Sequence, residues 1–361
     1  MRRLEIVQIG LGHVGRAVAQ IVLEERKRWQ ERRGVEVRYR AVSDTSGALV
    51  GEDLLPQAVR LKEEGGRLSE LGTEPLEDVL RSEPEPGFAR VVVDVAVHGG
   101  TFDLDLLGIE NGSYLVLSNK GPLSGSTAQY ERLMRMMPDR LWHEATVGAG
   151  MPLISTIGGL IETGDEIQEI QASPSGTLGF IMSSVEAGRS FSEAVKEAVD
   201  LHYAEPDPRD DLSGLDVARK AIILARMMGR GIEPEEIPYE SLVPDGLEDV
   251  PLDEFMARLP DHDDAFAARM TAVEPGHMLR YLARIPKVGQ VTVGLVGTPI
   301  ESPFGPISGP ENVFEIRTRR YSDVTLTVRG PGAGPERTAS GVVWDLLDIA
   351  HRAIESDERK D

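Results

Sequence analysis

The hydrophobic pattern begins with a short apolar run and then changes to a helical period. Residues 4–9 (LeuGluIleValGlnIle) predict a buried strand, and the pattern that follows to about Arg33 has the spacing of a long helix. Between them lies GlyLeuGlyHisValGly, whose glycines permit a tight turn and let a pyrophosphate approach the backbone. A strand, a GxGxxG loop and a helix in this order predict a dinucleotide site. The expected contacts are Gly10, Gly12, His13, Val14 and Gly15.

Three further apolar runs predict more strands of the same sheet. They cover residues 35–43, 90–97 and 114–118. The last run leads into Asn119 and Lys120, and residues just past the carboxyl ends of parallel strands line the ligand crevice of a doubly wound sheet. We therefore expect Lys120 to face the nicotinamide or the substrate, whereas a lysine in an ordinary loop would be exposed.

Asp44 directly follows the strand predicted at 35–43. An acidic residue at this place would accept hydrogen bonds from an adenine ribose and repel a 2′-phosphate, which favours NAD over NADP. Arg38 and Arg40 on the same strand work against that preference, and a role in the turn that follows is the alternative for Asp44. Both cofactors therefore stay open, with NAD favoured.

A helical segment further along carries Asp216 and Lys220 four residues apart, on a face that continues through Ile223 and Met227. A lysine between a carboxylate and apolar neighbours is a candidate acid or base, because desolvation and the carboxylate shift its pKa in opposite directions. The alternative is structural: Ser213 and Asp216 have the spacing of a capping box at a helix start.

The carboxyl-terminal third reads differently from the rest. Short alternating strands between 291 and 328, separated by Gly and Pro turns, predict an antiparallel sheet. The predicted fold class is α/β, an N-terminal Rossmann doubly wound sheet with an α+β catalytic and dimerisation region. The predicted division is a dinucleotide-binding domain at 1–135, a junction at 136–151, a catalytic substrate-binding domain at 152–285, antiparallel strands at 286–335, and at 336–361 a C-terminal helix that returns to the nucleotide domain.

Composition excludes several functional classes. The chain has 39 basic and 60 acidic residues, and a net charge of −21 disfavours nucleic acids and anionic membranes as partners. It has no cysteine, which excludes disulfides, thiolate metal sites and dehydrogenases that work through a thiohemiacetal. Because no signal peptide or membrane-spanning run is recognisable, we expect a cytoplasmic protein.

Five segments together resemble homoserine dehydrogenase, over nearly the whole chain. They are the cofactor loop GLGHVG, LSNKGPLSG, the domain-junction segment HEATVGAGMPLI, SPSGTLGFI and the long catalytic segment YAEPDPRDDLSGLDVARK. Near the C-terminus, NVFEIRTRRY and RGPGAGPERTASGVVWDLLDIA are similar to the closing strands and final glycine loop of that family.

The resemblance implies reversible NAD(P)-dependent oxidation of L-homoserine to L-aspartate 4-semialdehyde, on the route to threonine and methionine. By similarity, Lys220 exchanges the proton of the substrate hydroxyl, Asp216 orients Lys220, and Lys120 assists near the reacting centre. Glu205 would hold the substrate ammonium. The implied substrate contacts are Tyr203, Glu205, Asp210, Asp211, Gly176 and Thr177.

The resemblance also implies further cofactor contacts, a cation and an assembly. The cofactor contacts are Ser118, Asn119, Gly332 and Gly334, and the positions that bind a monovalent cation such as sodium are Glu144, Val147, Ala149 and Met151. A homodimer is expected through the antiparallel strands. No fused aspartokinase or regulatory domain is expected.

Two rival functions stay open. A dehydrogenase of a related amino hydroxy acid would keep Lys220 but change the groups around Glu205 and Asp210. A non-enzymatic NAD-binding sensor would keep the glycine loop and need neither Lys120 nor Lys220. The presence of both lysines argues against the sensor.

Overall fold

A computed structural model describes residues 2–97, 100–136 and 140–357. The chain divides into two compact units, in which unit 1 comprises Met1–Pro152 and Gly334–Asp361 and unit 2 comprises Leu153–Ala333. The last residues of the predicted C-terminal helix, 358–361, lie outside the described residues.

Unit 1 is built on a six-stranded sheet with the order β3-β2-β1-β4-β5-β6. The strands are β1 (Arg2–Ile9), β2 (Val35–Asp44), β3 (Gly47–Val50), β4 (Ala89–Asp94), β5 (Tyr114–Leu117) and β6 (Leu141–Trp142). All neighbouring pairs are parallel except β2 and β3, which form an antiparallel hairpin. Strands buried on both faces read as continuous apolar runs, which explains the ValValVal of β4.

Strand β4 is shorter than the sequence pattern predicts. The apolar run continues to Val97, but the strand ends at Asp94. The carboxylate of Asp94 accepts a hydrogen bond from the backbone N–H of Ala96, so the chain turns out of the sheet there. The run predicted at 90–97 therefore includes the start of a loop.

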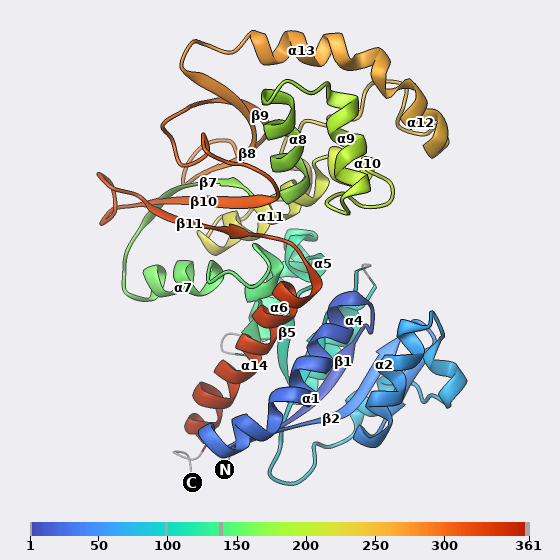
Figure 1. Ribbon diagram of the computed structural model, residues 1–361. Coiled ribbons are helices and arrows are strands. Elements are labelled where there is room, and N and C mark those ends of the chain that lie inside the picture. Colours follow the sequence, from blue (N-terminus) through green and yellow to red (C-terminus); the bar gives the residue numbers. More distant parts are fainter. Residues whose placement is uncertain (1, 98–99, 137–139, 358–361) are drawn as a thin grey trace. The chain divides into compact units, whose positions relative to one another are not determined.

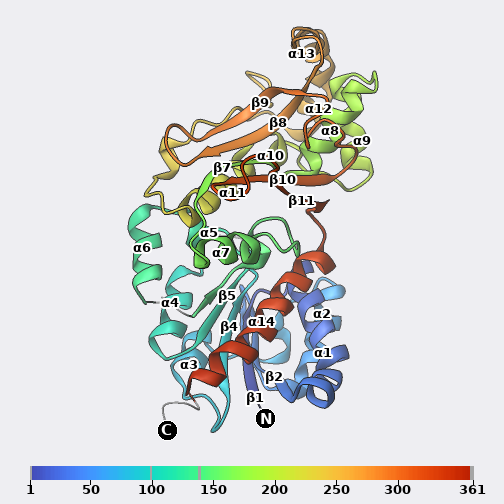
Figure 2. The same cartoon turned by 90° about the vertical axis from the view of Figure 1, so that its left-hand side faces the viewer.

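Helices cover this sheet, and α1 and α14 lie side by side in both views (Figure 1, Figure 2). Val18 and Val22 of α1 join Val342 and Leu346 of α14 in one buried cluster with the strands. The helical segments of unit 1 are α1 (His13–Arg33), η1 (Glu52–Leu54), α2 (Leu55–Glu63), η2 (Leu68–Leu71), α3 (Leu76–Arg81), α4 (Phe102–Glu110), α5 (Gly121–Ser124), α6 (Thr127–Met136), η3 (Glu144–Thr146) and α14 (Pro335–Asp357).

Unit 2 contains a five-stranded antiparallel sheet with the order β11-β10-β7-β8-β9. Its strands are β7 (Ile167–Ser173), β8 (His277–Pro286), β9 (Thr292–Pro299), β10 (Glu311–Thr318) and β11 (Leu326–Pro331). The helical segments are α7 (Ile154–Glu162), α8 (Gly176–Glu186), α9 (Phe191–Asp200), α10 (Arg209–Leu212), α11 (Leu215–Met227), η4 (Pro234–Glu236), α12 (Leu252–Arg258), η5 (Leu259–His262) and α13 (Asp263–Thr271). Helices α8 and α11 pack against β8, and this packing places the loop between β7 and α8 beside α11.

Within the described ranges, no helix has both the length and the apolar character needed to cross a bilayer.

Candidate active site

The glycine loop between β1 and α1 has the geometry that its sequence predicts. Gly10 has a φ of +100°, a conformation that favours glycine, and Gly12 is the N-cap of α1 with no side chain to satisfy the amides. A Cβ on Gly15 would lie 2.3 Å from the carbonyl oxygen of Gly10. His13 and Val14 form the first turn of the helix, so the open amides and the positive end of the helix dipole are available to an anion.

A buried glutamine, not predicted from the sequence, braces this loop. The Nε2 of Gln8 donates to the carbonyl oxygens of Gly10 (2.8 Å) and Gly15 (3.1 Å), and the hydroxyl of Tyr39 donates to its Oε1 (2.7 Å). Burial raises the pKa of Tyr39, so the hydroxyl stays a donor. The sequence signal that could have revealed Gln8 is its place as a polar residue inside an apolar strand, directly before the glycines of the loop.

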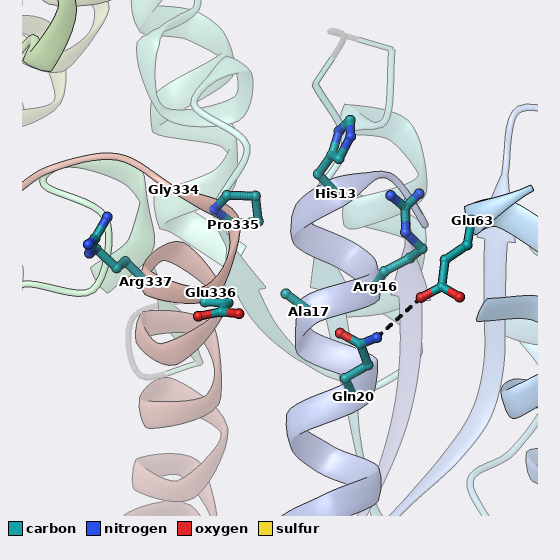
Figure 3. Close-up of a pocket in the computed structure, with 9 residues that line it drawn as sticks. All are labelled: His13, Arg16, Ala17, Gln20, Glu63, Gly334, Pro335, Glu336 and Arg337. Atoms are coloured by element: carbon teal, nitrogen blue, oxygen red, sulfur yellow. Dashed lines mark hydrogen bonds between the residues drawn. The ribbon is translucent and has the colours of Figure 1, made fainter. Parts of the chain in front are cut away.

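A cavity of about 420 Å³ opens beside the first turns of α1 and α14 (Figure 3). His13, Arg16 and Gln20 line it from α1, Glu63 lines it from the end of α2, and the segment 334–337 lines it from the start of α14. The Nε2 of Gln20 donates to Glu63 (3.3 Å). Of these residues only His13 and Gly334 were expected from the sequence, because the spacing of α1, α2 and α14 is a tertiary feature.

The carboxylate of Asp44 is engaged within the protein. Its Oδ1 accepts from the backbone N–H (2.8 Å) and hydroxyl (2.6 Å) of Ser46, and its Oδ2 accepts from Lys62 Nζ (2.9 Å) and the N–H of Leu68 (3.2 Å). Burial acts to raise the pKa of Asp44, but the hydrogen bonds from Ser46 and Lys62 outweigh it and hold the pKa below its usual value. The turn role that the sequence left open is therefore present.

Arg38, which works against a preference for NAD in the sequence, has partners of its own. Its guanidinium pairs with Glu85 and lies 3.6 Å from the centroid of the Phe88 ring.

Lys120 follows the end of β5 and is the N-cap of the short helix α5. Asn119 is buried beside it, donates through Nδ2 to Asp94 (2.9 Å) and accepts through Oδ1 from the N–H of Gly121 (2.9 Å). The backbone N–H of Ser118 donates to the carbonyl oxygen of Asp94 (2.9 Å). The neighbours on both sides of Lys120 are thus held by hydrogen bonds.

The segment predicted to bind a cation lies against α14 in unit 1. The N–H of Glu144 donates to Asp345 (2.9 Å), and burial raises the pKa of Asp345 well above its usual value. Ala149 has a φ of +55°, rare for a residue with a side chain. In the part of the chain that the structure describes, no three acidic or histidine side chains gather into a metal site. Any cation here would rely on carbonyl oxygens and Glu144, hard ligands of the kind that suit sodium.

The other two positions of this segment are Val147, fully buried, and Met151, whose N–H donates to the carbonyl oxygen of Gly148 (3.1 Å).

In unit 2, Lys220 lies on α11 and is only 8% exposed. Its Nζ pairs with Asp216 Oδ2 (2.8 Å) and donates to the carbonyl oxygen of Pro174 (2.6 Å), which immediately precedes α8. The side chain of Asp216 is 45% exposed, so the pair connects the protein interior to solvent. The ammonium is thus held by two oxygens, one charged and one neutral.

The capping box proposed for this helix is wrong. Helix α11 begins at Leu215 and its N-cap is Gly214 with a φ of +76°, so Ser213 lies one residue before the N-cap and its hydroxyl accepts only from the N–H of Leu215 (3.3 Å). A Cβ at Gly214 would lie 1.9 Å from the hydroxyl of Tyr281, a contact with β8 that the local spacing of Ser213 and Asp216 does not reveal. Asp216 is instead paired with Lys220.

The predicted substrate loop is tied to the start of α8. The hydroxyl oxygen of Thr177 lies 2.6 Å from the carbonyl oxygen of Tyr203 and 2.9 Å from Oδ1 of Asp211, so its one proton is shared between these acceptors, and the N–H of Glu205 donates to Asp211 (2.8 Å). Burial is the largest influence on the pKa of Asp211 and raises it, although both hydrogen bonds act to lower it. Asp211 therefore orders the loop, while the side chain of Glu205 is exposed.

The remaining predicted substrate and cofactor contacts are Asp210, Gly176, Gly332 and Gly334. Asp210 is exposed, and Gly176 is the first residue of α8, where Ser175 provides the cap. Gly332 follows β11, and a Cβ there would overlap the buried side chain of Asn312. Gly334 has a φ of +117° and belongs to the cavity of unit 1.

Two sets of predicted residues are thus assembled, each within one unit. Unit 1 holds the glycine loop, Asn119 and Lys120, and in unit 2 the segment 174–177 joins the Lys220 pair to Thr177 and the loop it anchors. Unit 1 thus combines a Rossmann-type sheet with a glycine loop, and unit 2 carries a buried lysine paired with a partly exposed aspartate, an arrangement typical of dinucleotide-binding enzymes.

Comparison with known proteins shows which enzyme family the chain resembles. The homoserine dehydrogenase family model matches residues 152–347. The chain is 37% identical to the homoserine dehydrogenase of Saccharomyces cerevisiae, over 78% of this chain and 80% of the yeast protein. It is 38% identical to the chloroplastic bifunctional aspartokinase/homoserine dehydrogenase 1 of Zea mays, over 95% of this chain but only 38% of that protein. A hyperthermophilic archaeal homoserine dehydrogenase in complex with NADPH has a similar structure, with a TM-score of 0.74, 27% identity, and coverage of 97% of this chain and 98% of that chain.

The chain belongs to the homoserine dehydrogenase family, whose members are NAD(P)-dependent oxidoreductases. The resemblance noted in the sequence is confirmed.

Proposed function

We propose that the protein catalyses the reversible NAD(P)-dependent oxidation of L-homoserine to L-aspartate 4-semialdehyde. The observation that carries the proposal is the buried Lys220, held by Asp216 and by the carbonyl oxygen of Pro174 inside the region that matches the family. A lysine so held can exchange a proton with a hydroxyl group and keep a fixed aim.

The chemistry divides between the two units. Unit 1 would hold the dinucleotide, whose nicotinamide would accept the hydride. As the neutral amine, Lys220 takes the hydroxyl proton when homoserine is oxidised, and as the ammonium it gives that proton to the aldehyde oxygen in the reverse reaction. Asp216 keeps the amine oriented and stabilises its protonated form. Lys120 assists as a cation near the oxygen on which negative charge develops.

The groups around α8 and the loop before α10 suit an amino acid. The amides of Gly176 and Thr177 lie in the first turn of an eleven-residue helix and favour the substrate carboxylate. The exposed carboxylates of Glu205 and Asp210 favour the substrate ammonium. The Thr177 hydroxyl is already committed to Tyr203 and Asp211, so its contribution is the backbone amide.

The test is homoserine-dependent reduction of NAD and of NADP by the wild type, Lys220→Ala and Lys196→Ala. Lys196 is an exposed lysine on α9 and gives the same substitution away from the site. We expect Lys220→Ala to lower kcat by about 10²- to 10⁴-fold, the range for loss of a general acid or base, and Lys196→Ala to match the wild type. A wild type with no homoserine-dependent turnover on either cofactor would refute the function. Near-normal turnover in Lys220→Ala would refute the role of that lysine alone.

For the cofactor, we propose NAD or NADP, with NAD slightly favoured. Asp44 carries a carboxylate at the end of β2, which would repel a 2′-phosphate, and Lys62 offsets part of that charge. The ratio of kcat/KM for the two cofactors tests this, and a clear preference for NADP would contradict it.

We further propose that Glu144, Val147, Ala149 and Met151 hold a sodium ion, mostly through carbonyl oxygens. The ion would stiffen the segment that packs on α14. Thermal unfolding in sodium chloride compared with choline chloride tests the proposal, and equal Tm values would contradict it.

A homodimer through the five-stranded sheet of unit 2 is also proposed. Val288 and Val324 support it, since they are 84% and 80% exposed on the loops of this sheet. Sedimentation velocity of the wild type and Val324→Asp tests the assembly. A monomeric wild type would contradict it.

A further inference from the structure

The carboxyl end of β4 carries a buried aspartate that gathers hydrogen bonds from three separate segments. Oδ1 of Asp94 accepts from the backbone N–H of Ala96 (2.9 Å). Its Oδ2 accepts from the hydroxyl of Thr101 (2.7 Å) and from Nδ2 of Asn119 (2.9 Å). Asp94 is fully buried, and among the residues that the structure describes it has no salt bridge. A buried carboxylate that accepts several hydrogen bonds but has no cationic partner is costly to ionise, so its presence calls for an explanation.

A second carboxyl group lies against it. Asp105 is on α4, one turn after the N-cap Thr101, and is also fully buried. Among the residues that the structure describes, none makes a hydrogen bond to either of its carboxyl oxygens. Burial, and then the charge of Asp94, raise the pKa of Asp105 well above its usual value. Two carboxyl groups so placed cannot both ionise at modest cost.

We propose that Asp94 and Asp105 hold one proton between them, on Asp105, and act as a positioning pair for Asn119 and Lys120. With Asp105 protonated, its O–H faces Asp94, which keeps the single negative charge and stays an acceptor for its three donors. The positioning role rests on the function proposed above for Lys120. The shared proton does not depend on that function.

The path from the pair to Lys120 is short. The carbonyl oxygen of Asp94 accepts from the N–H of Ser118 (2.9 Å) and of Asn119 (3.2 Å). The side chain of Asn119 then bridges from Asp94 to the N–H of Gly121 (2.9 Å). Lys120 is therefore held between two residues whose positions depend on Asp94.

The same carboxylate also reaches the cofactor loop. It fixes the N–H of Ala96, and a Cβ on Gly10 would lie 3.1 Å from that nitrogen. The segment after β4 thus packs directly on the glycine loop. Loss of the Asp94 charge would loosen both the support of Lys120 and one wall of the proposed cofactor site.

The experiment compares four variants of the full-length protein: Asp105→Asn, Asp105→Leu, Asp94→Asn and Asp103→Asn. An asparagine at 105 keeps a donor for Asp94 without a titrating proton, whereas leucine removes the donor. Asp103 is exposed on the same helix and provides the matched control. The measurements are kcat and KM for homoserine, the Kd for NADH, and the infrared carbonyl stretch of protonated carboxylic acids at neutral pH.

We expect Asp103→Asn to keep wild-type kinetics, and Asp105→Asn, which keeps a donor for Asp94, to lose less kcat than Asp105→Leu. Asp94→Asn should lower kcat by roughly 10- to 100-fold with a smaller change in KM, as expected for misplacement of a catalytic group, and should raise the Kd for NADH. The kcat of Asp105→Leu should lie between that of the wild type and that of Asp94→Asn. The infrared spectrum should lose one carboxylic acid band in Asp105→Asn and none in Asp103→Asn.

Wild-type kcat in a folded Asp94→Asn variant, or an unchanged infrared spectrum in Asp105→Asn, would overturn the proposal. If the wild type shows no homoserine turnover while the band and the Kd respond as expected, the proposed function fails and the proton-sharing pair stands.

Discussion

Replacing Asp105 by asparagine changes how the stability of unit 1 depends on pH. Asp105 is fully buried, and burial together with the charge of Asp94 raises its pKa well above its usual value. In the unfolded chain the same group has an ordinary pKa. The native protein therefore binds a proton that the unfolded chain releases above that value. Asparagine has no such proton in either state.

The magnitude follows from this difference of one proton. A raised native pKa contributes stability in full below the unfolded pKa, and the contribution is lost as the pH rises through the native pKa. Between the two pKa values the loss is about 1.4 kcal/mol per pH unit. In the same pH window, the free energy of unfolding of Asp105→Asn minus that of the wild type should therefore rise by this amount per pH unit.

The assay is urea unfolding followed by tryptophan fluorescence at a series of pH values. All three tryptophans, Trp29, Trp142 and Trp344, belong to unit 1, so the signal reports on the unit that contains Asp105. The exposed Asp103→Asn variant on the same helix is the control. If the difference between Asp105→Asn and the wild type is flat with pH, Asp105 has an ordinary pKa and the reasoning is refuted.

Other substitutions test separate features. Arg90→Met should lower the free energy of unfolding by about 3–5 kcal/mol, because Glu5, fully buried and 2.7 Å from Arg90 Nε, would lose its nearest cation and keep only the more distant Arg38 (3.9 Å); urea unfolding measures this, and a loss below 1 kcal/mol would contradict it. Gly15→Ala should weaken NADH binding by at least about tenfold, since its Cβ would lie 2.3 Å from a carbonyl oxygen of the loop; fluorescence titration measures this, and an unchanged Kd would show that the loop adapts. Lys62→Met should lower kcat/KM for NADP more than for NAD because it leaves the charge of Asp44 unopposed; equal losses would mean that Lys62 acts only on structure.

The sheet of unit 1 is predictable because local sequence carries the needed signal. Buried parallel strands read as apolar runs, so residues 35–43 and 114–118 match β2 and β5 within one residue. The glycine loop is predictable for the same reason, since Gly10, Gly12 and Gly15 are close in sequence and the strand and helix flank them directly. The α/β class with a Rossmann-type sheet is confirmed.

Features that depend on distant residues were beyond the sequence pattern. The start of α11 depends on Tyr281, a residue of β8 that lies against Gly214, and no local spacing contains that contact. Asp94 is visible in the sequence as a polar residue within the apolar run at 90–97. Its partner Asn119 is 25 residues away, and only the adjacency of β4 and β5 brings the two together.

Asp44 shows how a motif residue can change meaning through one distant partner. An acidic residue at the end of the second strand favours NAD when its carboxylate is available to the ribose and its charge is unopposed. Here both carboxylate oxygens already accept two hydrogen bonds each, and one donor is the ammonium of Lys62 at 2.9 Å. The ribose must therefore share or displace these donors, and a 2′-phosphate would meet the combined charge of a carboxylate and an ammonium. We infer that discrimination between the cofactors depends on the Asp44–Lys62 pair as a unit, because loss of Lys62 leaves a net negative charge there and loss of Asp44 leaves a net positive one.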